Sequence, residues 1–127
     1  MLVGLRGQKA KMPARILLVH DDRAYMEKVA STLQSAGHDV ATFATPMAAL
    51  GALETNRKID LLVTKVLFED AAIHGIALAR MARLKCLGIR ILFLDRAETQ
   101  RHTDGIGEFT AVPIEVPDLV QVIERLR

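Results

Sequence analysis

The sequence predicts a single α/β domain in which helices cover both faces of a five-stranded parallel sheet. Its 127 residues are enough chain for one domain with a normal core. Half of the residues are apolar and a quarter are charged, as in ordinary globular proteins. Short continuous apolar runs alternate with segments of helical periodicity. A strand that is apolar at consecutive positions is buried on both faces, as the strands of a parallel sheet are.

Five apolar runs have the length expected of strands. They cover residues 16–19, 40–43, 59–64, 89–94 and 109–112. The first run, Ile-Leu-Leu-Val, is compact and β-branched at both ends, which indicates a central strand. The fifth run predicts a short strand at the end of the series.

Segments with apolar residues at helical spacing separate these runs. The first predicted helix follows Asp22, the second opens at Thr45–Pro46, the third extends from Gly75 to Gly88, and the last opens at Pro117. Gly37 ends the first of them. Cys86, the single cysteine, falls on the inner side of the third helix and is interpreted as a small core residue.

The order of these elements restricts the topology. Right-handed crossovers favour the flavodoxin-like strand order 2-1-3-4-5, a (βα)5 three-layer sandwich. The segment between Arg96 and Glu108 has few apolar residues and two glycines, so the fourth helix is predicted to be short or irregular. In such sheets, functional sites form at the carboxyl ends of the strands, near the switch point between strands 1 and 3.

Polar and unusual residues occur at those strand ends. The first strand is followed by His20, Asp21 and Asp22, the third by Lys65, the fourth by Asp95, and the fifth ends in Val112 and Pro113. Because the carboxyl ends of parallel strands meet at one edge of a sheet, these side chains are predicted to lie close together. An ammonium at the tip of a buried strand is the least expected member of this set.

The segments "ILLVHDD", "DLLVT-x-V", "ILFL" and "FTAVP" resemble a response-regulator receiver domain of the chemotaxis-regulator type. The resemblance covers roughly residues 14–127 and keeps the family's spacing between the key positions. It implies two-component phosphorelay signalling through an aspartate phosphorylated at the end of strand 3. In that family, acids after strand 1 hold a magnesium ion, and a lysine after strand 5 and a hydroxyl after strand 4 contact the phosphoryl group.

Position by position, this chain departs from that pattern. Lys65 stands at the phospho-acceptor position, Val112 at the lysine position and Asp95 at the hydroxyl position. Phe109 occupies the switch-aromatic position, and the acid pair after strand 1 is reduced to His20–Asp21. A lysine cannot form an acyl phosphate, so the resemblance implies a degenerate phosphorylation pocket, that is, a pseudo-receiver.

Lys65 is predicted to fill the space of the magnesium ion and to pair with Asp21 or Asp95. In a largely buried pair, truncation of one partner would cost about 3–5 kcal/mol. The alternative is an ammonium that extends into water. Asp21 and Asp22 are weak metal candidates because Lys65 competes with a cation, and no metal or other cofactor is expected. Asp22 has an equally good role as a helix N-cap.

The four histidines show no ligand spacing for zinc. His20 is the only one predicted to lie near the pocket, as a neutral side chain hydrogen-bonded to a neighbouring acid.

Charge and hydropathy limit the range of partners. Residues 1–13 are interpreted as a basic, disordered leader before a domain at 14–127. Without Arg6, Lys9 and Lys11 the net charge of +2 becomes −1, which gives little support for nucleic-acid binding. No apolar run has the length of a membrane span or of a secretory signal. With a single cysteine, this indicates a cytoplasmic protein without membrane contact.

These observations predict a stand-alone receiver-like module, not an enzyme, that signals by protein–protein contact. The expected partner is a signalling protein or a component of a histidine-kinase pathway, and a homodimer through the face of strand 4, strand 5 and the last helix is a further expectation. One alternative is a small-ligand-binding or enzymatic domain that uses Lys65 with Asp21 and Asp95. Another is a receiver phosphorylated on a different acid, such as Glu69 or Asp70.

Overall fold

The chain forms a five-stranded parallel sheet in the order β2-β1-β3-β4-β5, which confirms the predicted topology. The computed structural model describes residues 13–55, 58–69 and 71–127. The strands are β1 (Arg15–Val19), β2 (Asp39–Phe43), β3 (Leu61–Thr64), β4 (Arg90–Asp95) and β5 (Glu108–Ala111). The helices are α2 (Arg23–Ser35), α3 (Pro46–Thr55), α4 (Gly75–Lys85) and α5 (Val116–Leu126), with a 3-10 helix η1 (Ala97–His102) between β4 and β5.

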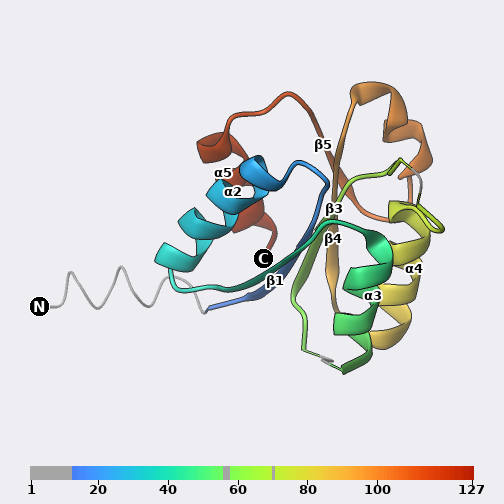
Figure 1. Cartoon of the computed structure of the whole chain (residues 1–127), viewed down its shortest axis with the longest axis horizontal. Coiled ribbons are helices and arrows are strands. Elements are labelled where there is room, and N and C mark those ends of the chain that lie inside the picture. The colour runs from blue at the N-terminus through green and yellow to red at the C-terminus, as the bar shows by residue number, and fades with distance from the viewer. Residues whose placement is uncertain (1–12, 56–57, 70) are drawn as a thin grey trace, which may run out of the picture.

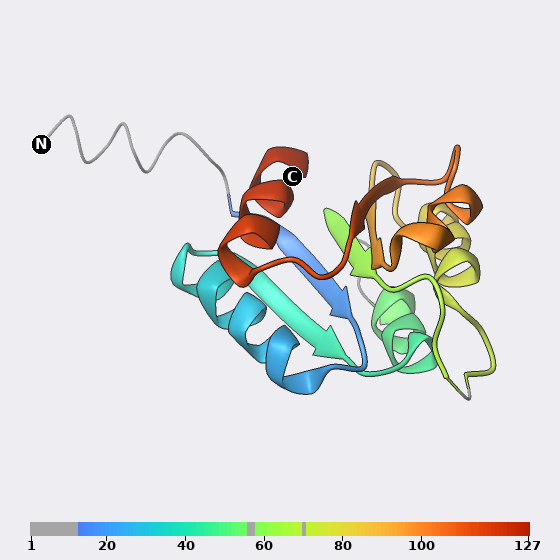
Figure 2. The same cartoon turned by 90° about the horizontal axis from the view of Figure 1, so that it is seen from above.

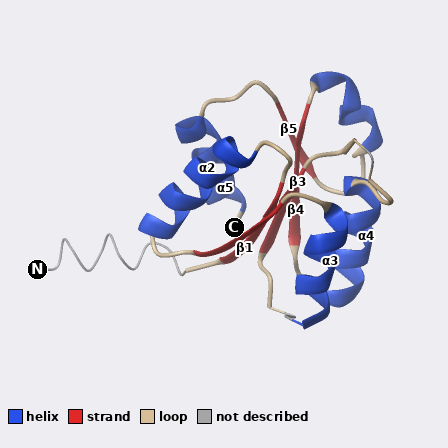
Figure 3. Cartoon of the chain, viewed as in Figure 1, coloured by secondary structure: helices blue, strands red, loops and turns tan. Residues whose placement is uncertain are grey.

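Three layers are visible from two directions. Helices α2 and α5 lie on one face of the sheet, and α3, α4 and η1 lie on the other (Figures 1 and 2). All strand pairs are parallel, and the central strands β1 and β3 are aligned from Ile16 opposite Leu61 to Val19 opposite Thr64. The colouring by secondary structure shows the sheet between the two helical layers (Figure 3).

The alternation of side chains along each strand builds two separate cores. Leu62 and Phe93 face α3 and α4, whereas Leu61 and Leu92 face α2 and α5. All four side chains are fully buried. The continuous apolar runs therefore form strands that are buried on both faces, as predicted, because each face packs against a layer of helices. Cys86 is buried in the first of these cores, directly after α4.

The ends of the elements follow local chemistry. The Asp22 carboxylate accepts a hydrogen bond from the Tyr25 amide at 3.1 Å and so caps α2, as predicted. Gly37 ends that helix with a φ of 98°. Strand β3 begins at Leu61, two residues later than predicted. Asp60 lies just before it, and its carboxylate accepts the Arg15 amide at 2.8 Å.

The fourth helix is short, as predicted. It is the six-residue 3-10 helix η1, and the Thr99 and Thr103 hydroxyls donate to the carbonyls of Arg96 and Gln100 at 2.7 and 2.8 Å. Both threonines are buried. Side-chain bonds of this kind compete with a regular helix, and runs of 3-10 helix are usually short. Beside β5, one face of the sheet is thus covered by the six-residue η1, whereas the opposite face is covered by the eleven-residue α5.

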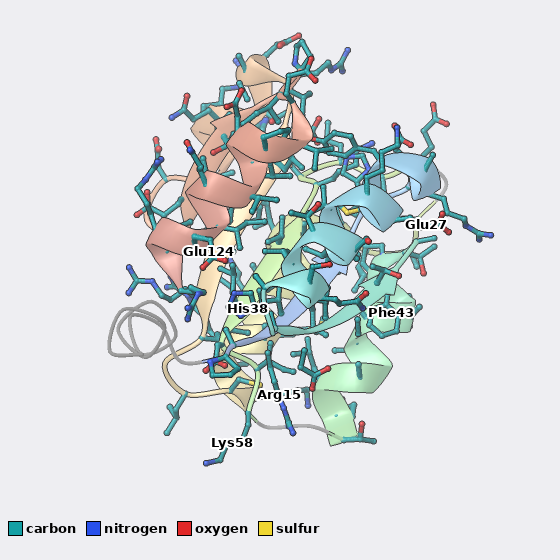
Figure 4. The ribbon with its side chains drawn as sticks, turned by 90° about the vertical axis from the view of Figure 1, so that its left-hand side faces the viewer. Arg15, Glu27, His38, Phe43, Lys58 and Glu124 are labelled. Atoms are coloured by element: carbon teal, nitrogen blue, oxygen red, sulfur yellow. The ribbon has the colours of Figure 1, made fainter. Side chains whose placement is uncertain are left out.

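A buried polar cluster ties the amino ends of the strands to α5. His38, which follows α2, accepts the Ala14 amide at Nδ1 (3.0 Å) and bonds Glu124 through Nε2 (3.0 Å). Glu124 also accepts from Arg127 at 2.7 Å. Figure 4 labels His38 and Glu124 where the end of α2 and the start of β2 meet α5.

The predicted leader, 1–13, lies outside the described residues except for Pro13, which precedes β1. Within the described part of the chain, no helix combines the length and the hydropathy needed to cross a membrane.

Candidate functional site

An open cavity of about 720 Å³ lies at the carboxyl ends of the strands. The residues that line it come from the end of β4 and from the segments after β1, β3, β4 and β5. They are His20, Asp21, Lys65, Leu67, Phe68, Glu69, His74, Leu94, Asp95, Arg96 and Val112. The backbone explains why these positions meet, since the Lys65 amide donates to the Val19 carbonyl at 3.3 Å and extends the β1–β3 pairing by one residue.

Lys65 pairs with Asp21. Its Nζ lies 3.2 Å from Asp21 Oδ1 and 3.1 Å from Oδ2. The side chains are 21% and 43% exposed, so the pair is not largely buried, and the cost of about 3–5 kcal/mol expected for its loss is too large. The Lys65 ammonium also lies 5.7 Å from the centre of the Phe68 ring, a cation–π contact. Of the two acids predicted to pair with Lys65, Asp21 and Asp95, the partner is therefore Asp21.

Asp95 has a different role from the one expected of a partner for Lys65. It is the last residue of β4, and only 6% of its surface is exposed. Its Oδ2 accepts the amides of Val66 and Leu67, both at 3.0 Å, and its Oδ1 accepts the Arg96 amide at 2.8 Å. Lys65, Asp21 and Asp95, the residues of the enzymatic alternative, line the same cavity, but the ion pair joins Lys65 to Asp21 while backbone amides hold the Asp95 carboxylate.

His20 lies at the cavity, as predicted, but its hydrogen-bond partner differs from the prediction. Its Nδ1 accepts the Asp22 backbone amide at 2.9 Å, whereas Asp21 Oδ1 is 3.6 Å away. An Nδ1 that accepts a hydrogen bond belongs to a neutral imidazole with its proton on Nε2. Burial, and then the nearby positive charge of Lys65, lower the pKa of His20 below its ordinary 6.5. The 3.6 Å approach is consequently not an ion pair.

His74 also lines the cavity, so the expectation that His20 is the only histidine near the pocket is wrong. Its Nδ1 accepts the Phe68 amide at 3.0 Å. The backbone explains its position: the Gly75 amide donates to the Val66 carbonyl at 3.0 Å, which closes the segment after β3 onto the start of α4. A side chain at Gly75 would overlap the Lys65 carbonyl. The glycine is thus required by close packing of two backbones.

Val112 and Pro113 follow β5 and line the wall of an adjoining cavity of about 610 Å³. Val112 lies between the two cavities and lines both. In the second cavity, the Tyr25 hydroxyl donates to the Ile114 carbonyl at 2.6 Å and joins α2 to the segment before α5. Phe109 is half-buried in β5 against the core under α4, opposite Phe93 of β4.

The polar groups of the site that the structure describes do not assemble into a metal centre. In residues 13–55, 58–69 and 71–127, no three His, Cys, Asp or Glu side chains are arranged to hold a metal ion. Asp21 faces Lys65, and Asp22 caps α2. Of the two loop acids considered as other acceptors, Glu69 lines the cavity and Asp70 lies outside the described residues.

Five residues that line the cavity were not expected from the sequence. They come from the segment after β3 and from the end of β4 and the residue that follows it, and they are Leu67, Phe68, His74, Leu94 and Arg96. For His74 the adjacent Gly75 was a usable signal, because a glycine that begins a helix directly after a loop indicates close packing. For Phe68 and Arg96 we find no local signal.

Comparison with known proteins identifies the fold. No family model and no curated protein matches this sequence. Among solved structures, the receiver domain of the hybrid histidine kinase CckA is 26% identical, with a TM-score of 0.75, over 89% of this chain and 98% of that chain. Chemotaxis response regulator CheY4 of Vibrio cholerae is 23% identical, with a TM-score of 0.79, over 91% of this chain and 100% of that chain.

A response regulator receiver protein from Sinorhizobium medicae is 24% identical, with a TM-score of 0.77, over 90% of this chain and 94% of that chain. These neighbours are receiver domains by name, and the agreement extends over nearly their whole length. The chain therefore has the receiver-type flavodoxin-like fold.

Proposed function

We propose that this chain is a receiver-like signalling module that acts by protein contact and is not phosphorylated at the end of β3. The observation that carries the proposal is the Lys65 ammonium, which stands at that position and pairs with Asp21 at 3.1 Å. An aspartate phosphorylated in the presence of a divalent cation needs a carboxylate nucleophile and free oxygen ligands. Here the nucleophile is replaced by a cation, and the acid that would hold the metal ion is engaged by that cation.

The environment of Val112 supports the same conclusion. Its side chain packs among the apolar residues near α5 and offers no positive charge to a phosphoryl group. We assign no catalytic residue and no cofactor. The pocket would be a pseudo-receiver pocket, and the module would work in the cytoplasm within a two-component pathway.

The partner would be a signalling protein, such as a component of a histidine-kinase pathway. The face formed by β4, β5 and α5 is the proposed side for a homodimer. Strand β5 is an edge strand of the sheet, and η1, which leads into it, is a six-residue 3-10 helix on the face opposite α5.

The test is the intact mass of the protein after incubation with acetyl phosphate and magnesium. Wild-type protein is expected to gain no phosphate, whereas a Lys65→Asp, Val112→Lys variant regains the nucleophile and the cation and is expected to gain one. A Lys65→Asn, Val112→Lys variant is the matched control, because it removes the lysine without supplying a carboxylate. A phosphate adduct on the wild type, on Glu69 or on another acid, would contradict the proposal.

A further inference from the structure

Among the residues that the structure describes, the donors to the Asp95 carboxylate are all backbone amides, which converge from two segments. Val66 and Leu67 follow Lys65 in the segment after β3, and Arg96 directly follows β4. The three N–H groups lie 2.8–3.0 Å from the two carboxylate oxygens. Convergent backbone N–H groups form an anion-binding concavity, in which partial positive charges face one point. The side chain of Asp95 thus fills a small anion site made by its own chain.

Burial makes these bonds important for the conformation of the loop. Asp95 is 6% exposed and Val66 is 1% exposed, so water has little access to replace the bond between them if it is lost, and the bonds from Leu67 and Arg96 are partly buried. A buried N–H without an acceptor is costly, which favours the loop conformation that keeps all three donors on the carboxylate. The carboxylate therefore fixes where the segment after β3 leaves the sheet.

The same segment is fixed at its other end as well. The Phe68 amide donates to His74, and the Gly75 amide donates to the Val66 carbonyl. Leu67, between these contacts, is 46% exposed at the rim of the cavity. The loop is consequently held against β4 by Asp95 and against α4 by Gly75, and it presents an apolar side chain to solvent between them.

We infer that Asp95 is an internal anionic ligand, which occupies a backbone site for a small oxyanion and holds the loop after β3 in one conformation without any modification of the chain. A free carboxylate or phosphate anion is excluded from this site as long as Asp95 fills it. This inference deepens the proposed function and rests on it for its meaning in signalling, since a loop fixed in this way would present one constant surface to a partner.

The experiment is amide hydrogen exchange, measured residue by residue on the full chain, with Asp95→Gly compared with wild type. Removal of the carboxylate is expected to speed exchange at Val66 and Leu67 about tenfold or more, because each amide loses its acceptor. Sodium formate, which fits the space of the missing carboxylate, should slow exchange again in a saturable way. Sodium chloride at equal ionic strength should not.

Two further variants separate a local effect from loss of stability. Asp95→Asn keeps the shape of the side chain but has an NH2 group in place of one acceptor oxygen, so at least one of the Val66, Leu67 and Arg96 amides should exchange faster than in wild type, even where the glycine variant does not fold. Formate should not change this exchange because the site remains filled, and wild-type exchange at all three amides would overturn the inference. Asp60→Ala removes a different carboxylate, which accepts a single amide at the opposite end of β3, and should leave Val66 and Leu67 unchanged. Leu62 and Leu92, in the sheet, report global opening.

Unchanged exchange at Val66 and Leu67 in Asp95→Gly would overturn the inference. So would acceleration that formate and chloride reverse equally, or acceleration that is the same at Leu62 and Leu92. These outcomes are independent of the phosphorylation test: a phosphate adduct on wild-type protein defeats the proposed function but leaves the formate effect as it is.

Discussion

Each end of the parallel sheet holds a histidine whose Nδ1 accepts a backbone amide, but the surroundings of the two differ. At the amino end, His38 is 6% exposed and bonds Glu124, which joins the end of α2 to α5. At the carboxyl end, His20 lies at an open cavity beside the half-exposed pair of Lys65 and Asp21. The amino-end cluster is a structural tie, whereas the charges of the carboxyl end remain accessible from solvent.

The comparison also explains which polar group matters most at the carboxyl end. Lys65 and Asp21 bond side chain to side chain, and both can turn toward water. In the described part of the chain, Asp95 is buried and accepts hydrogen bonds from backbone amides alone. His38 is also buried and accepts the backbone amide of Ala14. Burial and backbone partners, more than formal charge, identify the residues that determine the conformation of this protein.

The largest effect is expected from Gly75→Ala, which breaks the carboxyl end alone. The new Cβ would overlap the Lys65 carbonyl, and a backbone oxygen cannot move aside as a flexible side chain can. We expect a loss of about 3 kcal/mol in the free energy of unfolding, at the upper end for overpacking, measured by urea denaturation. Gly51→Ala in α3 is the control. It meets no atom within 4 Å and should stabilise the protein by about 0.5–1 kcal/mol.

The next effect is expected at the amino end, from His38→Ala. The Ala14 amide then loses its acceptor in a buried place, which costs about 2 kcal/mol in the free energy of unfolding. The matched substitution His102→Ala, at an exposed position of η1, should change stability by less than about 0.5 kcal/mol. Equal values for the two variants would show that the amino-end cluster is not a structural tie.

A smaller effect is expected for the pair of Lys65 and Asp21. A double-mutant cycle with Lys65→Ala and Asp21→Ala should give a coupling energy of about 0.2–1 kcal/mol, which decreases with added salt. The physical reason is the 43% exposure of the Asp21 side chain. A coupling energy several times larger, and insensitive to salt, would mean that the pair at the carboxyl end is as inaccessible to solvent as the His38 cluster at the amino end.

The smallest effect is a difference in pH dependence between the two ends. Burial and then Lys65 lower the pKa of His20, so as pH falls below 6.5 the unfolded chain takes up a proton that the folded chain does not. Stability therefore decreases below pH 6.5 until the lowered pKa is reached, and His20→Asn should flatten this part of the profile. Urea midpoints measured across the range give the test; an identical slope in the variant would contradict it.

Glu124 gives the corresponding window at the amino end. Burial alone would raise its pKa, but hydrogen bonds from Arg127 and His38 and their charges lower it below the ordinary 4.5. A carboxylate with a lowered pKa stabilises the folded state above 4.5, and this contribution is lost as pH falls through the lowered value. The carboxyl end is thus expected to respond to acid before the amino end does.

The sequence was sufficient for the strand order, the N-cap at Asp22 and the short fourth helix, because each depends on local periodicity or on a single residue type. It also predicted that Lys65 and Asp21 lie at the same edge of the sheet. The role of Asp95 could not be predicted from the sequence, since no residue type or spacing indicates that the amides of Val66 and Leu67 turn toward β4. The exposure of the Lys65–Asp21 ion pair could not be predicted either, because it depends on how the two side chains lie at the rim of the cavity.

The small size of β5 affects how copies of this protein can meet. An edge strand offers unpaired backbone groups to other chains and is a common starting point for aggregation. This one has four residues, from Glu108 to Ala111, and Pro113 follows soon after without an amide hydrogen to donate. Growth of the sheet from one copy into the next is therefore disfavoured, and copies that associate on this side must do so through the side chains of α5 and the sheet face.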